Sequence, residues 1–283
     1  MSAISLYAKP SCTFAQKLQA SRALLIASAA RHTPITQASS LGAEDMVLTH
    51  LIAATQIDCS VFVLDTGMLH PQTLALIEQI QTRYDRRVDL YRPEPTVAAQ
   101  FIANHGQSAM YKSLALRKAC CDFRKMVPLA RALEGKKAWI TGLRREQSNA
   151  RAEVPDVEQQ HLVVNGEATS RAKINPLADW TWGDVWHFIS EENIPYNPLH
   201  DAFFPSIGCA PCTRAVTLGE DSRSGRWWWE HESAKECGLH VDDGHTTTTA
   251  GATQELPAFE SLSATLSLLP SSVSKIAVKE IPV

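Results

Sequence analysis

Segments with the character of strands and of helices alternate along the first half of this chain. The expected strands cover residues 35–40, 59–67 and 87–91, and the expected helices cover 44–55, 71–84 and 95–106. The middle strand contains the run VFVL, which is apolar on both faces, as strands of parallel sheets are. Strands that alternate with helices in this way predict an α/β fold, in which a doubly wound, mostly parallel sheet is flanked by helices.

The whole chain divides into three expected regions. The first, 1–30, is an N-terminal segment and helix, with 1–12 loose and 13–30 helical. The second, 31–240, is the main domain, which adds a strand at 137–143, extended segments at 158–164 and 171–177, and a helix at 181–193 whose tryptophans are expected in the core. The third, 241–283, opens with the run DDGHTTTTAGATQ, whose low complexity predicts a disordered tail.

The turns that follow the strands supply candidate anion ligands, because ligands of open α/β sheets bind beyond the carboxyl ends of the strands. A turn that contains serine and glycine and leads into a helix offers backbone N–H groups to phosphate or sulfate, although an ordinary connecting loop has the same residues. The candidates after the early strands are Ser39, Ser40, Gly42, Asp65 and Gly67. Those after the strand at 137–143 are Arg144, Arg145 and Arg151, of which at least one is expected to be a plain surface charge.

Cys209 and Cys212 form a C-x-x-C pair, whose thiolates can face one metal centre. Such a pair alone fits zinc, iron–sulfur and dithiol redox sites. The adjacent Cys120 and Cys121 narrow the choice, because neighbouring side chains on a helix diverge by about 100° and are poorly placed to bind one small ion. An iron–sulfur cubane offers separate iron atoms to its thiolate ligands. We therefore expect a 4Fe–4S cluster on these four cysteines, with a zinc site or two buried apolar cysteines as the alternatives.

The cysteine doublet is expected to open a helical run that is kinked at Pro128. Lys125 follows Cys121 by four residues, which places the two on the same helical face. Its ammonium group could then pair with an anionic cluster and with an anionic substrate, although a solvated surface lysine is the alternative. Arg223 and Arg226, in the segment that follows the C-x-x-C pair, are further candidate ligands of an anion.

The composition argues against several classes of protein. The 283-residue chain has a net charge of −3, which disfavours broad nucleic-acid binding. Seven cysteines that include a doublet do not resemble the disulfide framework of a secreted protein, so a reducing cytoplasm is expected. No stretch approaches the ~20 apolar residues of a membrane helix. The run ALLIASAA at 23–30 loosely resembles part of a signal peptide, but the helix expected at 13–30 explains the same residues.

Several motifs together carry a resemblance to a known family. They are SSLGAED (39–45), LDTGMLHP (64–71), KACCDFRK (118–125), TGLRREQSNAR (141–151), CAPC (209–212) and KECGLH (235–240). From about Thr36 to His240 the chain resembles the assimilatory adenylyl-sulfate (APS) reductases of the iron–sulfur type, which are thiol-dependent sulfonucleotide reductases. The resemblance implies reduction of APS to sulfite and AMP.

The same resemblance implies a role for Cys237, which lies outside the metal-ligand pattern. Its thiolate would attack the sulfur of APS and form an S-sulfonate, with His240 and nearby arginines lowering the pKa of the thiol. An external dithiol of the thioredoxin or glutaredoxin type would then release sulfite. No nucleic acid or membrane partner is expected, and the sequence leaves a homo-oligomeric state open.

Three other interpretations stay open. A related enzyme could accept 3′-phosphorylated APS (PAPS), alone or beside APS, although PAPS enzymes without a cluster lack the two cysteine pairs. An ATP pyrophosphatase or tRNA-thiolating enzyme is less favoured, because Glu44 stands near the position of the loop lysine of that class. A zinc-stabilised binding module would use the same cysteines without catalysis.

Overall fold

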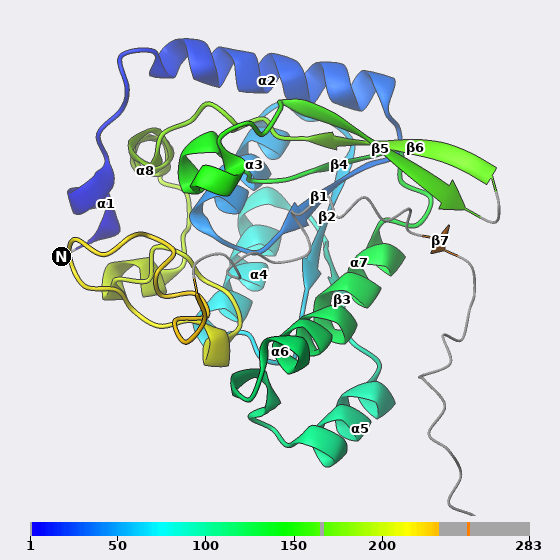
Figure 1. Cartoon of the computed structure of the whole chain (residues 1–283). Helices are drawn as coiled ribbons and strands as arrows, with labels where there is room; N and C mark the ends of the chain where they lie inside the picture. Colours follow the sequence, from blue (N-terminus) through cyan, green and yellow to red (C-terminus); the bar gives the residue numbers. More distant parts are fainter. Residues whose placement is uncertain (1, 165–166, 232–247, 250–283) are drawn as a thin grey trace, which may run out of the picture. The chain divides into compact units, whose positions relative to one another are not determined.

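A mostly parallel sheet organises the part of the chain that the computed structural model describes, residues 2–164, 167–231 and 248–249 (Figure 1). These residues belong to one unit, Met1–Ala250. The strand order is β3-β2-β1-β4-β6-β5-β7. The strands are β1 (Ile35–Ser39), β2 (Cys59–Leu64), β3 (Val88–Tyr91), β4 (Ala138–Ile140), β5 (Val157–Val164), β6 (Glu167–Ile174) and β7 (Thr248–Thr249).

The strand directions confirm the predicted α/β class. Strands β3, β2, β1, β4 and β6 run parallel to one another, and β5 is antiparallel to β6. The α-helices are α1 (Ala3–Tyr7), α2 (Phe14–Arg31), α3 (Ala43–Ala54), α4 (Pro71–Tyr84), α5 (Pro95–His105), α6 (Leu114–Cys121), α7 (Val127–Ala132) and α8 (Trp182–Glu191). In the described part of the chain no helix is both long and apolar enough to cross a membrane.

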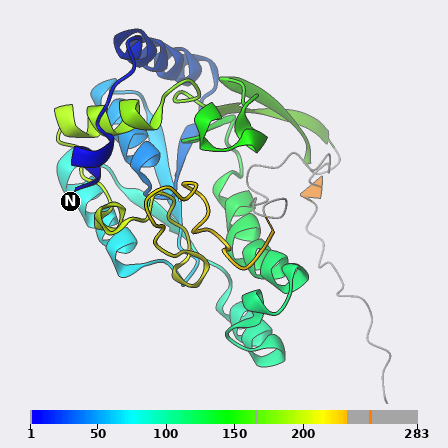
Figure 2. The same cartoon turned by 60° about the vertical axis from the view of Figure 1, so that its left-hand side comes forward.

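Side chains of β2 alternate between two cores, because successive residues of a strand point to opposite faces of the sheet. Cys59 and Val63 belong to a core that includes buried residues of α3, α4 and α8. Phe62 packs in a second core with Leu129 of α7 and Trp139 of β4. Helices α8 and α7 accordingly lie on opposite sides of the sheet (Figure 2). The two cores cover both faces of β2, so a ligand at this strand is expected at its carboxyl end.

The prediction that the cysteine doublet opens a helix is wrong. Cys120 and Cys121 end α6, which begins after Ser113, whose side chain accepts a hydrogen bond from the Leu116 N–H. A π-helical turn (Asp122–Met126) follows and leads into α7, with Pro128 in the first turn. Because proline has no N–H, a regular α-helical hydrogen-bond ladder cannot run through this junction. The doublet therefore lies immediately before the π-helical turn.

The expectation that residues 1–12 are loose is also wrong. Residues 2–13, here called the N-terminal arm, contain α1 and pack along α8. Backbone N–H groups of the arm have buried or partly buried acceptors: Ala3 donates to Asp201 at 2.7 Å, and Ser11 donates to Asp184 at 2.7 Å. These partners are distant in sequence, so no local pattern in the arm predicts them.

Candidate active site

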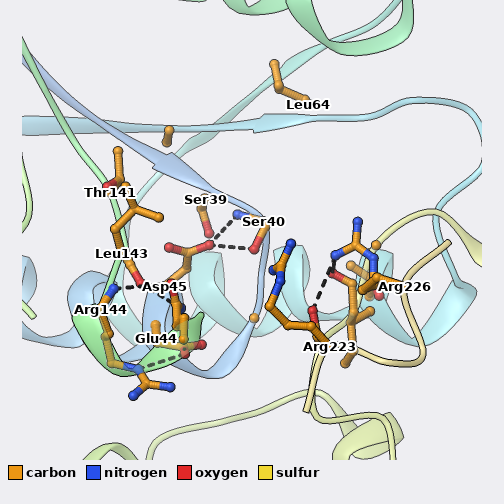
Figure 3. A pocket seen from close by; sticks show the side chains of 18 of the residues that line it. Ser39, Ser40, Glu44, Asp45, Leu64, Thr141, Leu143, Arg144, Arg223 and Arg226 are labelled. Carbon is orange, nitrogen blue, oxygen red and sulfur yellow. Dashed lines mark hydrogen bonds and ion pairs between the residues drawn. The ribbon is translucent and has the colours of Figure 1, made fainter. Parts of the chain in front are cut away.

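A cavity of about 360 Å³ opens at the carboxyl ends of β1, β2 and β4. Ser39, Leu64 and Thr141, which end or follow these strands, line it (Figure 3). Residues 205–209 and 222–227 contribute lining from the other side. A cavity of this size is within the range of about 300–1,000 Å³ that is typical of small-molecule sites. The rim predicted at the carboxyl ends of the strands thus contains a cavity large enough for a ligand.

Most of the predicted anion ligands line this cavity. They are Ser39, Ser40, Gly42, Lys125, Arg144, Arg151, Arg223 and Arg226. They come from segments far apart in the sequence, and the charged members of the set are cationic. Glu44, Asp45 and Glu146 add acidic side chains to the same lining. The cavity therefore gathers several positive charges around a space that is closed on one side by the sheet.

Asp65, Gly67 and Arg145 do not line the cavity in the described part of the chain. Asp65 accepts hydrogen bonds from the Gly67 N–H at 3.1 Å and from Arg92 Nε at 2.8 Å, which holds it in the turn after β2. Gly67 has φ of 70°, a left-handed conformation that favours glycine. Arg145 binds Asp156 and Asp179, so it is the surface charge that the arginine cluster was expected to contain.

Arg226 is a buried cation, only 8% exposed, with incomplete hydrogen bonding. Its guanidinium lies 4.7 Å over the ring of Trp227, and its Nη1 is 3.4 Å from Ser206 Oγ. Its Nε has no hydrogen-bond partner within the described residues. Gly208 lies directly against it, since a Cβ there would be 2.5 Å from Arg226 Nη2. An unpartnered buried N–H beside a cavity is well placed to donate a hydrogen bond to an anionic oxygen of a ligand.

Glu44, which stands near the position of the loop lysine of ATP pyrophosphatases, is held by cationic and amide partners. Its Oε1 accepts from Arg144 Nε and from Gln147 Nε2, both at 3.0 Å. Burial opposes ionisation, but the charge of Arg144 and these bonds outweigh it and lower the pKa of Glu44. Glu44 could be identified from the SSLGAED motif, but its pairing with Arg144, a hundred residues away, could not be predicted from the sequence.

Asp45 occupies the donors of the serine turn. Its Oδ2 accepts from the Ser40 N–H and from Ser40 Oγ, both at 2.6 Å (Figure 3). A Cβ at Gly142 would be 2.6 Å from Asp45 Oδ1, so only glycine fits at that position. The Asp45 carboxylate therefore accepts a hydrogen bond from the Ser40 N–H, a group that was expected to bind phosphate or sulfate.

Asp45→Asn should change how stability depends on pH. Burial raises the pKa of Asp45 from 3.8 to about 6. A carboxyl group with a higher pKa in the folded state stabilises the protein while protonated, and this contribution is lost as pH rises through the folded-state value. As pH rises from about 4 to about 7, the free energy of unfolding of Asp45→Asn should increase relative to that of the wild type by on the order of 2–3 kcal/mol.

Urea unfolding at a series of pH values measures this gain. Asp58→Asn, at an exposed position, is the matched control and should follow the wild type. Parallel pH profiles for Asp45→Asn and the wild type would contradict the prediction.

Trp182 and His200 also line the cavity and were not predicted as site residues. The ring of Trp182 lies 5.3 Å from the Arg144 guanidinium carbon and 6.0 Å from the His200 ring. Burial lowers the pKa of His200 to about 4, so its ring is neutral at neutral pH. Sequence periodicity correctly places Trp182 on an inward side of α8, but it cannot tell a core from a cavity wall.

All four predicted metal ligands line a second, small cavity. Its lining includes Cys120, Cys121, Cys209 and Cys212. Burial raises the pKa of the Cys120 thiol and raises that of Cys212 to about 12. Within the described ranges, no group of three or more histidine, cysteine or acidic side chains could hold a single metal ion. The structure thus brings together two cysteine pairs that are 87 residues apart in the chain.

The two cavities are neighbours with a common wall. Lys125, Cys209 and Trp227 line both of them. The Thr66 hydroxyl, which lines the larger cavity, is 3.3 Å from Cys209 Sγ. Cys237 and His240 lie outside the described residues. Of the four thiol-bearing residues, Cys209 therefore lines both cavities, whereas Cys120, Cys121 and Cys212 line only the smaller one.

Comparisons with known proteins find a matching family and close relatives of this chain. The phosphoadenosine phosphosulfate reductase domain matches residues 34–215. An adenosine 5′-phosphosulfate reductase of Burkholderia cepacia is 48% identical over 227 residues, which is 80% of this chain and 88% of the relative. One of Allochromatium vinosum is 52% identical over 206 residues, covering 73% of this chain and 78% of the relative.

A solved structure supports the fold independently. The phosphoadenylyl-sulfate (PAPS) reductase of Candida auris, in a phosphate complex, superposes with a TM-score of 0.58 at 24% identity. The match covers 70% of this chain and 90% of that one. On the domain match and these relatives, the chain belongs to the phosphoadenosine phosphosulfate reductase family.

Proposed function

We propose that this protein is an oxidoreductase of sulfate assimilation that reduces APS to sulfite and AMP. The observation that carries the proposal is that Lys125, Cys209 and Trp227 line both a cavity of about 360 Å³ with five cationic side chains in its lining and a cavity lined by four cysteines. The names of the relatives, which specify adenosine 5′-phosphosulfate, favour APS as the substrate.

The four cysteines fit a 4Fe–4S cluster. Thiolates are the ligands that such clusters require, and two adjacent plus two C-x-x-C thiols can reach separate iron atoms. Lys125 and Arg124 line the same cavity and would balance the negative charge of a cluster with thiolate ligands, whereas Arg117 in that lining is paired with Glu230. When bound, the cluster would place negative charge and a redox-capable group beside the substrate cavity. Cys120, Cys121, Cys209 and Cys212 are its proposed ligands.

The proposed nucleophile is the thiolate of Cys237. It attacks the sulfur of APS, an S–S bond forms, and the bond between sulfur and the phosphate oxygen breaks, so AMP leaves with the electron pair. One thiolate of an external dithiol then attacks Cys237 Sγ and releases sulfite. The second thiol of that reductant resolves the mixed disulfide and restores Cys237. The dithiol thereby supplies the two electrons of the reaction.

The cations of the larger cavity are proposed to bind the phosphosulfate. Charge develops on the leaving phosphate as the S–O bond breaks, and fixed cations in a partly dry site stabilise it. Arg226, with its unpartnered Nε, is the strongest candidate, and Lys125, Arg144, Arg151 and Arg223 are the other cations of the same lining. We assign to His240 the role of lowering the pKa of Cys237.

The remaining parts of the proposal concern partners and place. A thioredoxin- or glutaredoxin-type dithiol is the proposed reductant, because the covalent intermediate needs two electrons from a protein thiol pair. A reducing cytoplasm suits free cysteines, and the described ones are Cys12, Cys59, Cys120, Cys121, Cys209 and Cys212. A homo-oligomeric state stays an open part of the proposal.

PAPS is the second candidate substrate, favoured by the description of the matched domain and by the Candida auris structure. A side-by-side assay of sulfite release from APS and PAPS, with the same dithiol, tests the choice. We expect a higher kcat/KM for APS. A higher value for PAPS would overturn the substrate but not the reaction, and sulfite from neither would overturn the function.

Arg226→Ala and Arg223→Ala should each lower kcat/KM for APS by about tenfold or more. A charge-assisted hydrogen bond contributes about 1.5–3 kcal/mol, and 1.4 kcal/mol corresponds to a factor of ten. Arg145→Ala is the matched control, because that guanidinium is paired on the surface outside the cavity. Steady-state kinetics measure the effect, and unchanged values in both cavity variants would mean that the anion binds elsewhere.

A further inference from the structure

The N-terminal arm packs against the first turn of α8 without space between the two backbones. A Cβ placed on Gly183, in that first turn, would lie 2.1 Å from the Lys9 carbonyl oxygen. The next nearest atoms to it, the Lys9 carbonyl carbon at 3.0 Å and the Tyr7 carbonyl oxygen at 3.4 Å, also belong to the arm. Only a glycine at this position lets the arm dock so closely. The arm lies outside residues 34–215, which the family description matches.

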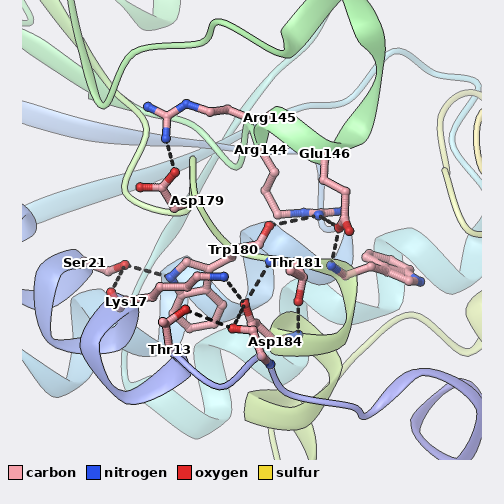
Figure 4. A network of polar contacts seen from close by, with 12 residues as sticks. Thr13, Lys17, Ser21, Arg144, Arg145, Glu146, Asp179, Trp180, Thr181 and Asp184 are labelled. Carbon is pink, nitrogen blue, oxygen red and sulfur yellow. Dashed lines mark hydrogen bonds and ion pairs between the residues drawn. The ribbon is translucent and has the colours of Figure 1, made fainter.

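A buried carboxylate fastens the arm to α8 (Figure 4). The side chain of Asp184 is fully buried and accepts from the Ser11 N–H at 2.7 Å and from Lys17 Nζ at 2.8 Å. It also accepts from the Thr181 N–H at 2.9 Å, which closes the first turn of α8. One carboxylate thus ties the arm, the start of α2 and the N-terminus of α8 together.

Trp182 connects the arm to the cavity. The Tyr7 ring of the arm lies 5.9 Å from the Trp182 ring, which lines the cavity. The guanidinium carbon of Arg144, another lining residue, lies 5.3 Å from the same ring. The Ala3 N–H of the arm donates to Asp201, which follows the lining residue His200 in the sequence. The arm therefore contacts one lining residue, Trp182, and the sequence neighbour of another, His200.

Arg144 is bound to the same turn of α8 by a second route (Figure 4). Its Nη1 donates to Glu146 Oε2 at 2.8 Å and to the Trp180 carbonyl oxygen at 3.2 Å. Glu146 Oε2 also accepts from the Trp182 N–H at 2.5 Å. Any movement of the first turn of α8 would therefore displace both the ring beside Arg144 and the acceptors that fix its guanidinium.

We propose that the N-terminal arm is a positioning element of the nucleotide cavity, and that Tyr7 and Gly183 are positioning residues acting through Trp182 and Arg144. The inference rests on the proposed role of the cavity in binding the nucleotide. By linkage, docking of the arm should strengthen nucleotide binding, and bound nucleotide should stabilise the docked arm to the same degree.

The test combines Gly183→Ala and Tyr7→Ala in the full chain with AMP as the probe. Gly183→Ala adds a methyl group whose close contacts are with the arm, whereas Tyr7→Ala removes the contact with Trp182 and adds nothing. Hydrogen exchange followed by mass spectrometry should show faster exchange in residues 2–13 of each variant. The Kd for AMP and the KM for APS should rise by about tenfold, a typical coupling between sites, with kcat within about twofold. Added AMP should slow exchange of the wild-type arm.

The iron content of both variants should equal that of the wild type, which separates positioning from general loss of structure. Cys12→Ser, at an exposed position of the arm, is the matched control and should leave exchange and Kd unchanged. An unchanged Kd in a variant whose arm exchanges faster, or failure of both variants to speed exchange, would overturn the proposal. Failure of the function itself looks different: the wild type would then not release sulfite from APS or not bind AMP.

Discussion

Cys237→Ser is expected to abolish sulfite release while the protein keeps its iron, its sulfide and its visible colour. A serine hydroxyl is far less nucleophilic than a thiolate at neutral pH, so the S-sulfonate would not form. The four proposed cluster ligands are other residues, gathered around their own cavity, and the substitution leaves them untouched. Loss of iron from this variant would mean that Cys237 belongs to the metal site.

The wild-type protein provides the positive half of this test. Incubated with APS but no dithiol, it should gain the mass of one SO₃ group on Cys237 and release one AMP for each adduct. Added thioredoxin should then discharge the adduct as sulfite. Cys12→Ser, which replaces an exposed thiol of the N-terminal arm, is the matched control and should behave as wild type. An adduct on Cys12 or on any cysteine other than Cys237 would refute the assignment.

The sequence predicted the sheet because its signals are local. The run VFVL of β2 and the proline at the start of α4 indicate a strand and a helix within a few residues, and their alternation predicts a parallel α/β sheet. The rim ligands followed from the same logic, since strand ends are visible in the sequence. The start of α6 was not predicted, because its N-terminal cap, Ser113, lies seven residues before the cysteine doublet and carries no strong helix-start pattern.

The parts that escaped prediction depend on contacts between distant segments. Glu44 and Arg144 form an ion pair although they are a hundred residues apart. Asp184 accepts a hydrogen bond from the N–H of Ser11, which lies 173 positions earlier. Arg144, Arg145 and Arg151 look alike in one motif, yet two line the cavity and one binds Asp156 and Asp179 at the surface. Only tertiary packing separates these outcomes.

Cys209→Ser or Cys120→Ser is expected to remove iron and sulfide together and to reduce sulfite release to background. Each substitution keeps the size of the side chain but replaces a soft thiolate with a hydroxyl, which is a poor ligand of iron–sulfur clusters. Anaerobically purified wild type should contain about four irons and four acid-labile sulfides per chain, the stoichiometry of one cluster. Metal and sulfide analysis, with the visible spectrum, gives the readout.

The matched control for the cluster is Cys59→Ser, in β2. Cys59 is also buried, but it belongs to the sheet core, and burial raises the pKa of its thiol to about 12. Its variant should therefore keep iron and sulfide, even if its stability falls. If the wild type instead contains stoichiometric zinc and no sulfide, the cluster proposal fails. The cysteine cavity would then be a structural zinc site. Lys125 would face thiolates bound to zinc and not thiolates bound to an iron–sulfur cluster.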